Sequence, residues 1–166
     1  MAALWIRTAG TVLLAALIGA CLPLTVPRLM GYQIYSVISG SMEPAVPTGS
    51  LVYIQEGDPA DLEEGDVIAF YGGGDGTAII THRVVENRVL MGELITKGDA
   101  NQEADISPVP YARCIGREVL TIPGAGRLAE LITGQKGRWA AGGVILAAVG
   151  LQLLAALLER KGGSGR

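Results

Sequence analysis

The chain has 166 residues, of which 49% are hydrophobic and 17% are charged, and its formal net charge at pH 7 is −3. This composition is too apolar and too poor in charge for an ordinary soluble domain, and it excludes a collagen, a coiled coil and a long disordered chain. We therefore expect part of the chain to lie in a lipid bilayer.

Two uncharged segments account for the apolar excess. Residues 8–27 and residues 139–158 are each 20 residues long and contain no charged side chain. A helix of this length reaches about 30 Å, which is the thickness of one hydrocarbon core. We expect two transmembrane helices, with residues 1–7 as a short cytoplasmic tail and residues 159–166 as a flexible cytoplasmic tail.

Cys21 leaves an alternative open for the first segment. Arg7, an apolar core and the small residues before Cys21 resemble a lipoprotein processing site, which would remove the helix and lipidate this cysteine. The uncharged run continues through residue 26, however, so we expect a retained helix. Cys21 and Cys114 differ too much in setting to predict a disulfide, and one histidine gives no metal-type spacing, so we expect no metal and no cofactor.

The segment between the spans, residues 28–138, is long enough for one compact domain. It carries 9 Lys and Arg against 15 Asp and Glu, a net charge of −6, so we expect no nucleic-acid partner. Basic residues near the spans are nearly balanced between the tails and the domain, so charge alone does not fix the orientation. Two spans do place both tails on one face of the membrane and the domain on the other.

Short apolar runs broken by Gly, Pro and Asp characterise this domain and predict a mainly β fold. The runs are rich in Val, Ile and Tyr, and no helical period runs long among them. We expect strands at residues 33–38, 51–55, 66–71, 78–86, 88–91, 94–97 and 113–122.

The connections carry their own signals. The glycine-rich residues 72–76 predict a flexible hairpin tip, and residues 86–88 predict a tighter one. Residues 128–132 predict a short amphipathic turn before the second span. The Gly- and Ser-containing end after Lys161 is typical of a disordered tail.

A candidate nucleophile lies in residues 36–44, where a predicted strand ends in a turn of small residues that Pro44 stops. Such a turn can present one serine hydroxyl at the surface. Serine is a weak nucleophile at pH 7, so this hypothesis requires a base elsewhere in the chain.

His82 and Lys97 are the candidate bases. A lysine would need its pKa lowered by about three units, roughly 4 kcal/mol, to act at neutral pH, whereas histidine titrates near neutrality. Strand alternation places His82 on the same face as Ile80 and Val84, a half-buried setting that suits a neutral imidazole. An ordinary core histidine remains the alternative interpretation.

A third group is needed to orient the imidazole, and the loop after Lys97 contains Asp99 and Asp105. Their spacing of six residues is not diagnostic. From composition alone, the same loop could be a solvated acidic turn.

Four blocks of sequence, in order, resemble a type I signal peptidase. They are Ser39-Gly40-Ser41-Met42-Glu43-Pro44, Gly65-Asp66-Val67-Ile68, His82-Arg83-Val84, and Thr96-Lys97-Gly98-Asp99-Ala100-Asn101 with Asp105. A histidine in place of the bacterial lysine is similar to the endoplasmic-reticulum type branch, which includes archaeal and SipW-like members. The chain departs from the family pattern at Gly49-Ser50, where Gly-Asp is usual, and at Ala100, where Asn is common.

The resemblance implies a catalytic assignment. Ser41 would attack the scissile carbonyl and His82 would be the general base. Asp105 looks like the acid that faces the histidine, while Asp99 would support the geometry or share the role. The Ser41 N–H and the Ser39 hydroxyl would donate to the oxyanion, each typically contributing about 3 to 4 kcal/mol.

Substrate contacts follow from the same resemblance. An extended substrate would lie beside a strand as an added strand, with alternate side chains in shallow apolar pockets. Val37 and Met42 adjoin the serine and are the candidate walls, although core packing explains them equally well. Tyr32, Tyr35 and Trp139 would anchor the protein at the membrane interface.

The implied fold is a signal-peptidase-like antiparallel β domain flanked by two transmembrane helices. The implied function is a membrane-bound serine endopeptidase that removes signal peptides, with preproteins, the lipid bilayer and the secretion translocon as partners. The protein would be a multi-pass cell-membrane protein with its catalytic domain on the extracytoplasmic side. The alternative is a catalytically silent β domain, tethered to the membrane, that binds exported or membrane proteins.

Overall fold

The computed structural model describes residues 1–73 and 77–163. The chain divides into two compact units. One unit is Val26–Ala129, and the other combines Met1–Thr25 with the segment from Glu130 onward.

Long helices form the unit that contains both ends of the chain. Helix α1 spans Ala2–Leu29 and helix α3 spans Gln135–Gly163. Each is long and apolar enough to cross a membrane, over Leu4–Leu29 and Gln135–Glu159 with mean hydropathies of 2.1 and 2.2. Both overlap the segments predicted as spans. Residues 164–166 of the predicted flexible tail lie outside the described residues.

The two long helices contact each other through small and polar residues. Ala148 on α3 is fully buried, and a Cβ atom added at Gly10 would lie 3.1 Å from its carbonyl oxygen. The Gln152 amide donates a hydrogen bond of 3.0 Å to the Thr11 hydroxyl. Small residues that allow close approach, with polar side chains that bond across the contact, are typical of helix pairs in membranes.

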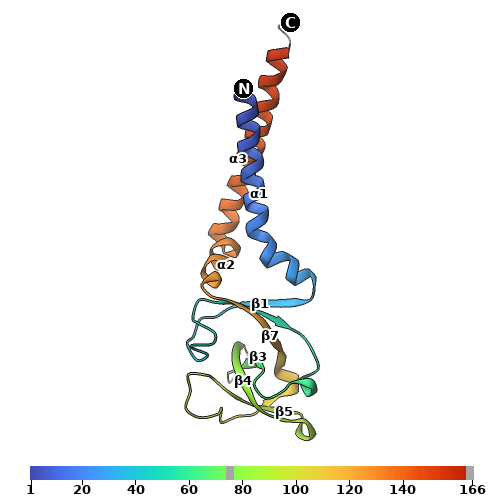
Figure 1. Cartoon of the computed structure of the whole chain (residues 1–166), viewed down its shortest axis with the longest axis vertical. Helices are drawn as coiled ribbons and strands as arrows, with labels where there is room; N and C mark the ends of the chain where they lie inside the picture. The colour runs from blue at the N-terminus through green and yellow to red at the C-terminus, as the bar shows by residue number, and fades with distance from the viewer. Residues whose placement is uncertain (74–76, 164–166) are drawn as a thin grey trace. The chain divides into compact units, whose positions relative to one another are not determined.

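The other unit is built on one antiparallel sheet, in the order β1-β2-β7-β3-β4-β5-β6 (Figure 1). A mainly antiparallel β domain flanked by two long apolar helices is thus confirmed. The strands are β1 (Tyr32–Ser36), β2 (Leu51–Gln55), β3 (Val67–Gly72), β4 (Ala78–Arg88), β5 (Glu93–Lys97), β6 (Val109–Pro110) and β7 (Cys114–Ile122). Short 3-10 turns η1 (Pro59–Asp61), η2 (Val89–Met91) and η3 (Tyr111–Arg113) join some of them, and helix α2 (Ala125–Thr133) follows β7.

The predicted strand at residues 88–91 and the predicted turn at residues 86–88 are wrong. Strand β4 continues through Arg88, and the chain reverses in η2, which Gly92 closes in the left-handed conformation. Asn87 does not form a turn; its side chain donates to the Leu62 carbonyl at 2.8 Å, which ties β4 to the connection between β2 and β3.

The glycine-rich tip lies partly outside the described residues, which omit 74–76. Strands β3 and β4 pair up to Gly72 and Ala78, as expected for the strands that such a tip would join. The amphipathic turn predicted at residues 128–132 lies inside the longer helix α2.

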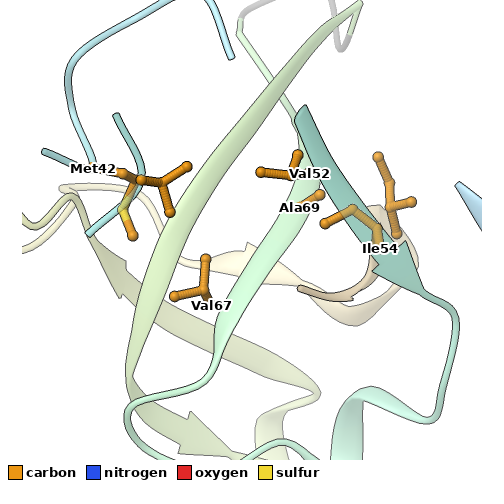
Figure 2. Packing of buried hydrophobic residues seen from close by; sticks show 7 residues of the cluster. Met42, Val52, Ile54, Val67 and Ala69 are labelled. Carbon is orange, nitrogen blue, oxygen red and sulfur yellow. The ribbon is translucent and has the colours of Figure 1, made fainter. Parts of the chain in front are cut away.

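The sheet is coiled enough to bury β3 on both of its faces. Val67 and Ala69 belong to one core cluster, whereas Ile68 and Phe70 belong to a second. Alternate side chains of a strand point to opposite faces, so β3 serves both clusters. Figure 2 shows Val67 and Ala69 in the first cluster, together with Met42 from the turn between β1 and β2.

Candidate active site

Ser41 lies in the long connection between β1 and β2, which is pinned at its base. The Val37 N–H donates to the Ser50 carbonyl at 2.9 Å, and the Gly49 N–H donates to the Val37 carbonyl at 2.8 Å. These two bonds extend the β1–β2 ladder past its last strand residue. The residues between them form a closed loop with fixed ends.

Met42 anchors the turn that contains the serine. Its side chain is only 2% exposed and packs into the first core cluster (Figure 2). Its carbonyl accepts the Val46 N–H at 2.8 Å, which closes a helical turn directly after Ser41. Ser41 precedes Met42 and is half-buried, so the buried Met42 side chain fixes the position of a partly exposed serine.

A carboxylate fastens the far side of the same turn. Glu43 accepts hydrogen bonds from the Thr48 hydroxyl at 2.8 Å and from the Thr48 N–H at 3.2 Å. These bonds favour the ionised carboxylate and lower the pKa of Glu43. The turn is therefore held by its own side chains as well as by the core.

His82 lies on β4 and is more buried than predicted, with 8% of the residue exposed. Its ring meets Phe70 edge to face, at a centroid distance of 6.2 Å. Ile80 and Val84 pack in the second core cluster, as the alternation predicted. His82 Nδ1 lies 2.6 Å from Asp105 Oδ2, so a carboxylate faces this nitrogen.

Ser41 and His82 approach each other across Gly98. A Cβ atom at Gly98 would lie 2.6 Å from the Ser41 carbonyl oxygen and 3.0 Å from His82 Nε2. The Ser41 carbonyl also accepts the Ala100 N–H at 2.9 Å. The loop after β5 thus touches the serine turn directly and leaves Nε2 at the junction.

Asp99 faces Arg83 instead of the imidazole. Arg83 Nε and Nη2 donate to the two Asp99 oxygens at 2.8 and 2.6 Å, and Nη1 donates to the Gly65 carbonyl at 2.7 Å. The Arg83 guanidinium lowers the pKa of the Asp99 carboxyl. Of the two aspartates left open by the sequence, the structure places Asp105 next to His82 and pairs Asp99 with Arg83, which ties β4 to the loop before β3 and to the loop after β5.

Lys97 lies on the opposite side of the ladder from His82. Lys97 pairs with Arg83, and Thr96 pairs with Val84. Because neighbouring residues alternate in direction, Thr96 shares the face of His82 and Val84, while Lys97 shares the face of Arg83. This register supports histidine over lysine as the base.

A cavity of about 300 Å³ adjoins the serine. Val37, Ser39, Ser41 and Met42 line one side, and β4 residues from Ile79 to Thr81 line the other. The two residues predicted as substrate walls therefore border a real cavity, although Met42 also belongs to the core. Ser39 is exposed, and the Ser41 N–H donates to none of the described residues.

A larger cavity of about 890 Å³ borders His82 and Asp105 from the side of the loop before β6. Ser41 is not among the described residues that line it. Ser41 lines the smaller cavity. Within the described residues, no group of three His, Cys, Asp or Glu side chains could hold a metal ion.

Three contributions were missed by sequence reasoning. Thr96 donates from its hydroxyl to Asp105 Oδ2 at 2.7 Å. Arg83 forms an ion pair with Asp99, and Gly98 leaves room for the Ser41 carbonyl and the His82 ring to lie close together. All three residues lie inside the quoted blocks, but neither spacing nor composition reveals these contacts.

Comparison with known proteins finds no family model that matches the chain. Signal peptidase I W of Bacillus subtilis (strain 168) is 44% identical over 86 residues, which are 50% of this chain and 44% of that protein. The chain resembles a SipW-like type I signal peptidase. The resemblance drawn from the four blocks is confirmed, and the match covers less than half of the relative's length.

Gly98→Ala should destabilise the domain by about 1 to 3 kcal/mol, because the added methyl group would overlap a backbone carbonyl that the Ala100 N–H already holds. Thermal unfolding of the detergent-solubilised chain, followed by circular dichroism, measures the change. Gly57→Ala is the matched control, since no atom lies within 4 Å of a Cβ at that position. Equal melting temperatures for the two variants would contradict the close approach.

Asp99→Asn should reduce stability at neutral pH and have little effect in acid. The pKa of Asp99 is lowered from 3.8 in the folded state, so the stabilisation is present above 3.8 and is lost as pH falls through the folded pKa. Melting temperatures of wild type and variant between about pH 2 and about pH 7 test the expectation. Glu103→Gln is the control, and a difference that stays constant with pH would contradict the ionic contribution.

Proposed function

We propose that the chain is a membrane-bound serine endopeptidase that removes signal peptides from exported preproteins. The observation that supports this most is the hydrogen bond between His82 and Asp105, beside a turn that presents Ser41 at a cavity. Similarity to Signal peptidase I W supports the reaction class. The serine mechanism, the substrate and the cleavage site at the membrane surface are parts of the proposal.

Each group has a defined role in the proposed reaction. The Asp105 carboxylate accepts a hydrogen bond from Nδ1–H and stays ionised, which leaves the Nε2 lone pair directed to the junction with the serine turn. Nε2 takes the Ser41 hydroxyl proton as Oγ bonds to the scissile carbonyl carbon, and the imidazolium then gives that proton to the leaving amine. Water repeats the sequence on the acyl-enzyme, and the acid is released with Ser41 restored.

The developing oxyanion would receive the Ser41 N–H and the Ser39 hydroxyl. Fixed donors act most strongly when they do not have to reorganise as charge develops. The Ser41 backbone is fixed from both sides, because Met42 is buried and the Ser41 carbonyl is bonded to the Ala100 N–H.

An extended substrate fits along the first half of β4. Strand β4 pairs with β3 from Ala78, but its pairing with β5 begins only at Arg83. Residues 78–81 therefore present an edge that a substrate backbone could join as an added strand. That edge and Val37 border the same cavity, whose volume of about 300 Å³ favours small side chains next to the cut.

Anchoring would confine the enzyme to the surface where signal peptides emerge. Two helices of suitable length and hydropathy support a membrane protein. We propose that both span the bilayer with the β domain on the extracytoplasmic side, close to the translocon, since tethering raises the local concentration of substrate and enzyme. Trp139 is exposed on α3, as an interface anchor would be, whereas Tyr35 packs against the domain core.

Ser41→Ala and His82→Ala should each lower kcat/KM by about 10⁴-fold or more, while Lys97→Ala should leave it within a few-fold of wild type. The measurement is cleavage, in lipid vesicles, of a preprotein with small residues at the first and third positions before the cut. Circular dichroism confirms that each variant folds.

Two results would contradict the assignment in different ways. Activity that survives His82→Ala and is lost in Lys97→Ala would indicate a Ser-Lys pair. A folded wild-type protein that binds the preprotein without cleaving it would favour the alternative, a silent β domain that binds exported proteins.

A further inference from the structure

Asp105 lies in a loop, whereas its hydrogen-bond partner His82 lies on strand β4, so the position of the carboxylate needs an explanation. Residues 98–108 contain no strand, and the Asp105 side chain is 24% exposed. The His82 side chain is 10% exposed, and the residue pairs with β3. A short contact between a loop carboxylate and a fixed imidazole needs a second attachment on the loop side.

Thr96 supplies that attachment at two points. Its hydroxyl donates to Asp105 Oδ2 at 2.7 Å, and its carbonyl accepts the Asp105 N–H at 2.8 Å. One bond fixes the backbone of Asp105 and the other fixes its side chain. A single residue of β5 therefore holds both the backbone and the side chain of Asp105.

Thr96 is itself fixed relative to His82. It is fully buried, and it pairs across the β4–β5 ladder with Val84, two residues from His82 on the same face. A β-branched side chain has few rotamers, so its hydroxyl keeps one direction. The strand pairing therefore fixes the distance between the His82 ring and Thr96, and Thr96 in turn fixes the position of the Asp105 carboxylate.

Both donors reach the same carboxylate oxygen. Asp105 Oδ2 lies 2.6 Å from His82 Nδ1 and 2.7 Å from the Thr96 hydroxyl. Two donors on one oxygen determine the rotation of the carboxylate about its last bond. With that rotation fixed, Nδ1 keeps the proton and Nε2 remains the acceptor that faces the serine turn.

We propose that Thr96 is a positioning residue, which holds the Asp105 carboxylate in the one orientation that fixes the tautomer and direction of the His82 ring. Thr96 is not among the described residues that line the cavity beside Ser41. It would act through Asp105. Its effect on turnover rests on the proposed peptidase activity, whereas its effect on the imidazole does not.

The test is an NMR measurement on the full chain in detergent micelles, and it relies on the chain having a single histidine. His82 is the only histidine in the sequence, so the imidazole resonances of isotope-labelled protein belong to one ring. In wild type, the Nδ1 proton should appear well downfield, as expected for a short bond to a carboxylate. Thr96→Val keeps the side-chain shape, removes the donor and should lose this resonance to exchange, while Thr96→Ser should keep it.

Thr121→Val is the matched control, because Thr121 on β7 also donates to a carboxylate, that of Glu118, at 2.9 Å. It should leave the Nδ1 proton resonance and the cleavage rate unchanged. If Thr96→Val fails to fold, Thr96→Ala removes the same donor without adding volume and takes its place.

Cleavage assays provide the second readout. Thr96→Val should lower kcat by about 10- to 100-fold with KM nearly unchanged, because a donor to a charged group is lost and substrate contacts are not. Thr96→Ser should restore most of the rate. Adding Thr96→Val to Asp105→Asn should cause no further loss, since the threonine acts only through that carboxylate.

The outcomes separate the two proposals. A Thr96→Val protein that keeps the downfield proton and the wild-type kcat would overturn the positioning role. Additive losses in the double variant would overturn it as well. If no variant and no wild type cleaves preproteins, the peptidase proposal fails, and the Nδ1 resonance still decides the role of Thr96.

Discussion

The hydrogen bond between His82 and Asp105 is the interaction on which the candidate site depends. It joins a strand in the middle of the sheet to a loop that also holds the serine turn. This contact fixes the tautomer of a buried imidazole. One ring nitrogen is committed to the carboxylate, and the other lies near the serine turn, where the proposed mechanism needs a base.

The loop after β5 makes most of the contacts that bring the candidate site residues together. Gly98 allows the close approach, Asp99 ties the loop to Arg83, and the Ala100 N–H bonds the Ser41 carbonyl. These contacts lie within three consecutive residues, so one short segment connects the serine turn to β4. Positional precision of this kind matters because small displacements at a reacting centre reduce rates strongly.

The sequence predicted the fold well where periodicity or composition reports a local property. The apolar runs located β2 to within its bounds, and alternation placed His82 on the face of Ile80 and Val84. The tight turn predicted at residues 86–88 is wrong because Asn87, a residue typical of turns, lies in β4 and donates its side-chain amide to carbonyls of the loop between β2 and β3. A long-range bond of this type has no local signature.

The candidate site divided in the same way. Residue type singled out His82 over Lys97, and the family resemblance indicated Ser41 and the two aspartates. Spacing could not tell Asp99 from Asp105, because the difference lies in an arginine on β4 and a threonine on β5, each brought into place by strand register. Met42 was ambiguous for a similar reason, since it is a core residue and a cavity wall at once.

The contact between α1 and α3 has a consequence for the whole chain. Gln152 bonds to Thr11, and Gly10 lies against Ala148, so segments near the two ends of the chain are joined to each other. The β domain is then the inside of a closed loop, whose ends stay together even when the sheet unfolds. By the chain-entropy relation for disulfides, a covalent cross-link around a loop of about 140 residues reduces the entropy of the disordered state by an amount equivalent to roughly 5 kcal/mol. The helix pair would act as a noncovalent counterpart of a disulfide in a chain whose two cysteines are both free.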